Sequence, residues 1–187
     1  MTPDPSSWPS KMGVEPGAKI LLMADVTRIA WSFRRAGVRF SADLLLNAFL
    51  ERLGAEGTLV VPAFNYDLKP GERFDVRRTA TISGALGQAA LSHSAFARTA
   101  QPLHSFAVAG GLQRTFLQAD DPSSFGPRSA FALLREHDFK LIAIDMPLEP
   151  AFTYVHFVEE SSRVTYRRWR DIPIRYTDHR GITVDRT

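Results

Sequence analysis

Three side chains between positions 153 and 159 have the types and the spacing that acid–base chemistry needs. Thr153, His156 and Glu159 are three residues apart, so they lie along one face if the segment is helical. Imidazole titrates near pH ~6.5 and can take a proton from an attacking amine. Glu159 or Glu160 could hold the imidazole in the tautomer that accepts this proton, and Thr153 offers a further hydrogen bond. The trio therefore indicates a general base with its orienting group.

The same spacing allows a purely structural alternative. An amphipathic helix would bury its apolar residues and leave the polar trio in water. The residues that would face inward in that case are Phe152, Val155 and Phe157. From the spacing alone, both interpretations stay open.

The trio follows an apolar run, Lys140 to Asp145, that is typical of a buried strand. A polar helix face just past such a strand occupies the position at which open α/β sheets bind ligands. Further strands are expected at 19–24, 57–62, 106–109 and 172–176. Helical spacing and caps predict helices at 42–53, 84–91 and 129–136. The alternation predicts the α/β class, with helices on both faces of a sheet in three layers.

Length and composition predict a single domain. The 187 residues suffice for one core, expected over residues 18–187, and the start, rich in Pro and Ser, predicts a flexible leader over residues 1–17. No apolar run approaches the ~20 residues of a membrane span, and the start lacks a signal-peptide pattern. A cytoplasmic protein with no membrane partner is therefore expected. The net charge of +3 is mild, and the basic residues are not concentrated enough to predict a nucleic-acid partner.

Several kinds of site are excluded by the residues available. The absence of cysteine excludes disulfides, thiolate metal sites and a cysteine nucleophile. The five histidines lack the spacing of metal ligands, so no metal is expected. The glycine-rich phosphate loops G-x-x-x-x-G-K-[ST] and G-x-G-x-x-G do not occur. A serine hydrolase with Ser105 or Ser124 as nucleophile would need a G-x-S-x-G elbow, which the chain lacks.

Five segments, in the same order along the chain, resemble the motifs of the aminoglycoside 3-N-acetyltransferase family, the antibiotic N-acetyltransferase group. They are G-A-E-G-T-L-V-V-P-A-F-N-Y-D at 54–67, R-F-D at 73–75 with I-S-G-A-L-G at 82–87, R-T-A-Q-P-L-H-S-F-A-V-A-G at 98–110, S-S-F-G-P-R-S at 123–129, and F-T-Y-V-H-F-V-E at 152–159. The chain looks like a shortened and diverged member. The resemblance implies an α/β/α sandwich with a central mixed sheet of the antibiotic N-acetyltransferase type. It also implies acetyl-CoA as the acyl donor and an amino sugar as the acceptor, either an aminoglycoside or a nucleotide-linked 3-amino sugar.

The resemblance also assigns roles by position. His156 matches the family's catalytic histidine, with Thr153 and Glu159 beside it. His104 and Ser105 match positions that line the site. The loop expected near the cofactor contains Ser123, Phe125 and Gly126. A homodimer is a further expectation.

Other polar residues near the expected cleft have two interpretations each. Asp67 and Asp75 could receive a cationic amine, or they are solvated loop acids and caps. Trp169 and the arginines around it could bind the phosphates of CoA or of a nucleotide sugar, or they form an exposed basic face. These arginines are Arg163, Arg167, Arg168 and Arg170.

The chain departs from the family pattern at the end of its first strand. The family has H-S-S-L there, and this chain has Ala24-Asp25-Val26-Thr27. Thr27 and Arg28 are then the polar residues left to contact the cofactor, and the Asp25 carboxylate would repel its phosphates. A second hypothesis therefore remains: a family member without catalytic activity that binds a ligand or a partner.

Overall fold

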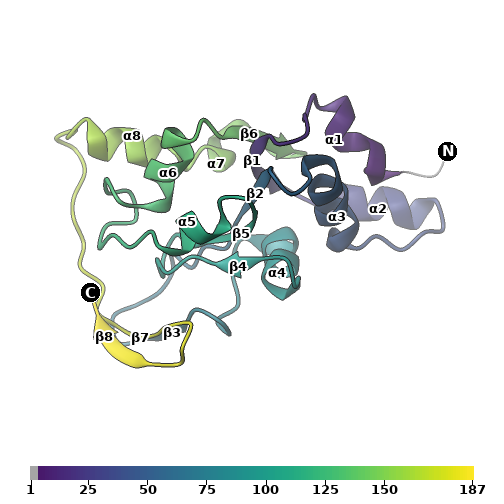
Figure 1. Ribbon diagram of the computed structural model, residues 1–187. Helices are drawn as coiled ribbons and strands as arrows, with labels where there is room; N and C mark the ends of the chain where they lie inside the picture. The colour runs from purple at the N-terminus through teal and green to yellow at the C-terminus, as the bar shows by residue number, and fades with distance from the viewer. Residues whose placement is uncertain (1–3) are drawn as a thin grey trace.

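A computed structural model describes residues 4–187 of the chain (Figure 1). Its main sheet contains five strands within this range, in the order β4-β5-β2-β1-β6. β1 pairs in parallel with β2 and β6, and β5 runs antiparallel to β2 and β4. The bounds are β1 Lys19–Ala24, β2 Thr58–Pro62, β4 Ala97–Arg98, β5 Phe106–Gly110 and β6 Lys140–Ile144. The predicted central mixed sheet is confirmed.

The two faces of this sheet carry separate apolar clusters because strand side chains alternate between the faces. In β1, Ile20 and Leu22 belong to one cluster, and Leu21 belongs to the other. The first cluster packs on α2 Thr27–Arg35, α3 Ala42–Leu53 and α4 Gly84–Ser92. The second packs on α5 Gln113–Leu117, α6 Ala130–Glu136 and α8 Val155–Ser161. The molecule is therefore the three-layer α/β/α sandwich that the sequence predicts.

A second, smaller sheet lies beside the main one and joins distant parts of the chain. β3 Arg73–Asp75 pairs in parallel with β7 Ile174–Thr177, which pairs antiparallel with β8 Thr183–Arg186. Phe74 and Tyr176 stack between the strands at 5.9 Å between ring centroids. The predicted late strand thus exists, beginning two residues later and ending one residue later than expected, and its partner β3 contains the buried Phe74.

The segment between α8 and β7 runs along the outside of the molecule (Figure 1). We call residues 162–173 the strap. Short α7, Leu148–Ala151, precedes α8. The strap therefore connects the helix that carries the candidate base to the small sheet.

The N-terminal segment, for which composition predicts a flexible leader, contains short helices in its described part. Residues 1–3 lie outside the described residues, but η1 Pro5–Ser7 and α1 Trp8–Lys11 follow. Val14 is buried in the first cluster, and its carbonyl accepts a hydrogen bond from Arg52 of α3 at 2.7 Å. Proline and serine stabilise a short helix when they occupy its first positions. Composition alone does not show which positions they occupy.

Within the described range, none of the helices combines the length and the apolar character that crossing a membrane requires.

Candidate active site

His156 and Glu159 form the centre of the candidate site on α8. The Nδ1 atom of His156 lies 2.9 Å from Oε2 of Glu159, one helical turn further on. Thr153 lies just before the helix, and its carbonyl accepts the backbone N–H of His156 at 3.1 Å. The spacing argument thus brings the three residues together, although Thr153 is in the preceding turn rather than in the helix.

The structural alternative for this helix expected three apolar residues to face inward. Phe157 is buried, but Phe152 and Val155 are 41% and 38% exposed. α8 is therefore anchored on the sheet by one aromatic side chain, and its acidic residues Glu159 and Glu160 line a cavity.

Glu159 has two further partners, both from the strap. Tyr166 donates its hydroxyl to Oε1 at 2.8 Å, and Arg167 donates to Oε2 at 2.5 Å. Hydrogen bonds from His156, Tyr166 and Arg167 lower the pKa of Glu159 to about 2. The carboxylate stays ionised, and both it and Nη1 of Arg167, at 3.0 Å, contact Nδ1 of His156. The tautomer in which Nδ1 donates to Glu159 is the one that leaves Nε2 unprotonated. No periodic pattern in the sequence marks Tyr166 and Arg167, because they follow the helix in irregular chain.

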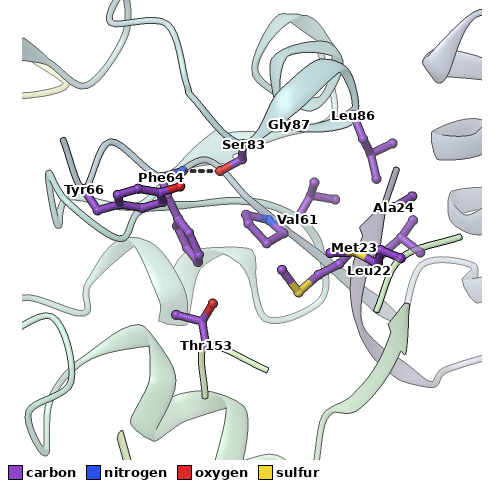
Figure 2. A pocket seen from close by; sticks show the side chains of 12 residues that line it. Leu22, Met23, Ala24, Val61, Phe64, Tyr66, Ser83, Leu86, Gly87 and Thr153 are labelled. Carbon is purple, nitrogen blue, oxygen red and sulfur yellow. Dashed lines mark hydrogen bonds between the residues drawn. The ribbon is translucent and has the colours of Figure 1, made fainter. Parts of the chain in front are cut away.

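One cavity adjoins the Thr153 end of α8. This Thr153 cavity has a volume of about 180 Å³ and is formed mainly by apolar side chains at the ends of β1 and β2. Figure 2 shows Thr153 across the cavity from Tyr66 and Ser83. The Ser83 hydroxyl accepts the backbone N–H of Phe64 at 2.8 Å, which fixes the loop after β2. Gly87 also lines the cavity, and any side chain there would collide with the carbonyl of Pro62.

A second, larger cavity adjoins the Glu159 end of α8. It has a volume of about 590 Å³ and lies between the strap, residues 101–104 and residues 122–125. We call it the strap cavity. Ser123, Phe125 and His104, all expected near substrate or cofactor, line it together with Glu159. Glu159 lines this cavity and Thr153 lines the other, and His156, three residues from each in sequence, is among the lining residues of neither.

His104 is held in an aromatic environment. Its ring lies 4.8 Å from that of Phe125, and Phe125 in turn lies 5.4 Å from the ring of His156. Burial, followed by the positive charges of His156 and Arg167, lowers the pKa of His104 to about 4. Nδ1 of His104 is 2.9 Å from the hydroxyl of Ser124. An imidazole of such low basicity is a poor acceptor for a serine proton, so this pair orients the loop rather than activating a nucleophile.

Ser105 is fully buried beneath the site. Its hydroxyl donates to the carbonyl of Ala63 at 2.7 Å and accepts from Nε of Arg98 at 2.8 Å. A guanidinium cannot act as a general base. The hydrogen bonds of Ser105 therefore support the structure and give no support to the serine-hydrolase alternative.

The two candidate aspartates are not brought together. Asp67 is exposed in the loop after β2. Asp75 accepts the backbone N–H of Arg77 at 2.9 Å and pairs with its side chain at 3.3 Å. The contacts of Asp75 are those of a turn cap.

The two candidate residues at the start of α2 have partners of their own. The backbone N–H of Thr27 donates to Asp25 at 2.9 Å. Nε of Arg28 donates to Asp145, at the end of β6, at 2.8 Å. Arg28 thus ties α2 to β6, and its charge is shared with a carboxylate.

The loop at 121–128 is organised by a buried carboxylate that the sequence did not single out. Asp121 accepts the backbone N–H groups of Ser123 at 2.9 Å and Arg128 at 3.0 Å. Its carboxylate fills the space that a side chain at Gly126 would need. The hydroxyl of Ser123 donates to Glu160 at 2.8 Å, which ties the loop to α8. In the sequence, the pair Asp121-Pro122 is typical of a turn, and this pattern was the local indication of the loop.

Metal ligands do not converge anywhere in the described part of the chain, where no group of three or more His, Asp or Glu side chains could hold an ion.

Comparison with solved structures identifies the class of fold. The structure "AAC-IIIb binary with CoASH" superimposes with a TM-score of 0.82 at 20% identity, covering 97% of this chain and 72% of that one. AAC-VIa bound to sisomicin gives 0.79 at 19% identity, with the same coverage. YokD from Bacillus subtilis gives 0.79 at 18% identity, covering 98% of this chain and 78% of that one. At these identities the likeness establishes a shared fold, that of the aminoglycoside acetyltransferases.

The family follows from the sequence itself. A family model described as aminoglycoside 3-N-acetyltransferase matches residues 29–186, most of the chain. The chain belongs to this family, whose members are acyltransferases. No curated protein matches the sequence significantly.

Proposed function

We propose that the protein transfers the acetyl group of acetyl-CoA to an amino group of an amino sugar, with His156 as the general base. The observation that carries this proposal is the hydrogen bond between His156 and Glu159, with one cavity lined by Glu159 and another by Thr153. A transferase must hold donor and acceptor close to the base, and we assign one substrate to each cavity. The structures solved with CoA and with sisomicin support the two classes of substrate.

The roles follow from the geometry. The narrow, apolar Thr153 cavity suits the thioester arm of the donor, and the wider strap cavity suits the acceptor. Glu159 accepts the Nδ1 proton, so Nε2 of His156 takes a proton from the amine as the nitrogen attacks the thioester carbonyl. The tetrahedral intermediate then collapses, the C–S bond breaks, and the imidazolium returns the proton to the departing thiolate. The products are the amide and CoA.

Thr153 is proposed to hydrogen-bond the donor, and His104 and Phe125 to shape the acceptor side. Arg167 and Tyr166 act as positioning residues, because they hold Glu159 in the orientation that fixes the His156 tautomer.

A thiol-release assay with acetyl-CoA and a panel of amino sugars tests the proposal. We expect His156→Ala to lower the rate by about a hundredfold or more, the usual contribution of a general base. Binding of CoA, measured by titration calorimetry, should remain unchanged in this variant. The exposed His179 provides the matched control, and His179→Ala should retain the wild-type rate.

The second candidate is a family member that binds ligands without turnover. It is favoured by Asp25 at the end of β1 and by the pairing of Arg28 with Asp145, which leave little free positive charge for a donor phosphate at that position. Wild-type protein that neither binds CoA at millimolar concentration nor releases thiol would contradict the transferase proposal in favour of this second candidate.

A further inference from the structure

The strap cavity has a charge pattern that the proposed acyl transfer does not require. Five arginines line it, and they come from the strap and from β8: Arg163, Arg167, Arg168, Arg170 and Arg186. Three acidic side chains line it as well, and two of them are already engaged. Glu159 is held by Arg167, and Glu160 accepts from Ser123. Asp171 is the third.

The three strap arginines that remain are available to a ligand. Arg186 pairs with Asp120 outside the cavity. Within residues 4–187, Arg163, Arg168 and Arg170 form no ion pair, and all three are exposed. Guanidinium groups bind phosphate oxygens in pairs through their planar forks. The strap therefore offers three guanidinium groups that can bind phosphate and that form no ion pair within the described residues.

An aromatic surface lies among these arginines. Trp169 is 78% exposed and lines the same cavity. Such exposure is unusual for the largest apolar side chain, and its indole face can stack on a nucleobase. The cavity volume of about 590 Å³ is within the range of small-molecule sites.

We propose that the strap cavity binds a nucleoside diphosphate group, with Arg163, Arg168 and Arg170 on the phosphates and Trp169 against the base. This inference rests on the proposed function for its place beside His156, and it narrows the substrate class. Two molecules could bring this group: a nucleotide-linked amino sugar as acceptor, or the nucleotide end of CoA. A polycationic aminoglycoside without phosphate fits the arginines poorly, because like charges repel.

Titration calorimetry with uridine diphosphate tests the site without any acyl transfer. We expect binding to wild type that weakens as salt is raised. Arg168→Ala/Arg170→Ala should weaken it by about tenfold or more, since two charged hydrogen-bonding groups are lost. Trp169→Ala should weaken it by about fivefold or more. The matched control, Arg34→Ala/Arg39→Ala, removes the same charge from exposed positions in and after α2 and should bind as wild type does.

A repeat of the titration with saturating CoA distinguishes the two sources. Uridine diphosphate that still binds assigns the site to the acceptor. Competition by CoA, together with weaker CoA binding in Arg168→Ala/Arg170→Ala, assigns it to the donor's nucleotide. No binding of uridine diphosphate at millimolar concentration, or an equal loss in the control variant, would overturn the inference. If the nucleotide does not bind but thiol release depends on His156, the proposed function stands and the nucleotide site is contradicted. If the nucleotide binds but no thiol is released, the nucleotide site stands and the proposed function is contradicted.

Discussion

At the scale of single residues, the site contains two histidines that share one aromatic neighbour but differ in environment. His156 is about half exposed and is paired with a carboxylate. His104 is largely buried, bonds only a serine hydroxyl through its side chain, and stacks among aromatic rings. Burial favours the neutral form of an imidazole, and it lowers the pKa of His104. The pair therefore places a proton acceptor beside a histidine that stays neutral.

The lowered pKa of His104 makes folding sensitive to acid. In the unfolded chain His104 takes up a proton near its ordinary pKa of 6.5, but in the folded protein it does so only at about 4. The unfolded state therefore binds more protons between these values, and the stability that is present above pH 6.5 is lost as the pH falls toward 4. We expect a loss of roughly 2 kcal/mol between pH 7 and pH 5 from this residue. Urea unfolding at both values should show it for wild type.

His104→Gln should remove this part of the pH dependence, because glutamine does not titrate. His179→Gln, at an exposed position, serves as the comparison and should keep the wild-type difference. Equal pH dependence in wild type and His104→Gln would contradict the assignment.

At the scale of elements, Arg98 joins the two sheets. It is 4% exposed, and its guanidinium donates to Ser105 at 2.8 Å and to the carbonyl of Ala63 at 2.7 Å. It also donates to Asn65 and to the carbonyl of Thr79, and it lies 4.7 Å from the ring centroid of Phe74 in β3. Burial lowers the pKa of Arg98 to about 10, so it remains charged at neutral pH. A single cation thus holds β4, the loop after β2 and the small sheet together.

Replacement of Arg98 should therefore destabilise the fold substantially. Arg98→Ala leaves several buried acceptors without donors and opens a cavity against Phe74, and we expect a loss of roughly 3 kcal/mol or more in the free energy of unfolding. Arg98→Lys keeps the charge but not the planar fork, so it should recover only part of this loss. Denaturant unfolding at neutral pH measures both variants. An alanine variant within about 0.5 kcal/mol of wild type would show that Arg98 does not join the sheets energetically.

The elements that sequence reasoning found are those with strong periodic or capping signals. The four longer strands of the main sheet are mainly apolar runs, and α3 has the predicted bounds, with Ser41 capping its start and Gly54 its end. α2 was missed because only Ile29 and Phe33 are buried and no side chain caps its start. β3 and β4 have three and two residues, too few for any period to appear. Their positions depend on contacts with distant strands, which local pattern does not encode.

The candidate site shows the same division. The spacing of His156 and Glu159 indicated their contact, because one helical turn joins them, and Thr153 contacts His156 through its backbone carbonyl. Tyr166 and Arg167 reach Glu159 from irregular chain, and Asp121 acts through backbone N–H groups of its own loop. Such contacts depend on the path of the chain rather than on residue type, so they became visible only in the structure.

At the scale of the whole molecule, a closely packed sandwich supports the strap, which forms one wall of the strap cavity and has few backbone hydrogen bonds. Residues 106–109 of β5 are buried, with paired strands on both sides. Across the described strap, by contrast, no backbone N–H between residues 165 and 172 donates to another backbone group. Backbone amides without such partners open to solvent at little cost in free energy.

Hydrogen exchange should therefore divide the molecule in two. We expect the amides of 165–172 to exchange among the fastest and those of β1, β2 and β5 among the slowest, as followed by mass spectrometry of peptides at neutral pH. Slow exchange across 165–172 would mean that the strap is held more firmly than its backbone contacts indicate.

The pairing of β3 with β7 has a consequence for how the protein is made. As the chain leaves the ribosome, every strand of the main sheet has emerged once residue 144 is free, and the sandwich can begin to form. β3 must then wait for a partner that is synthesised about a hundred residues after it. The wall that carries the arginines is thus synthesised after the base and the strands of the main sheet, and forms against them.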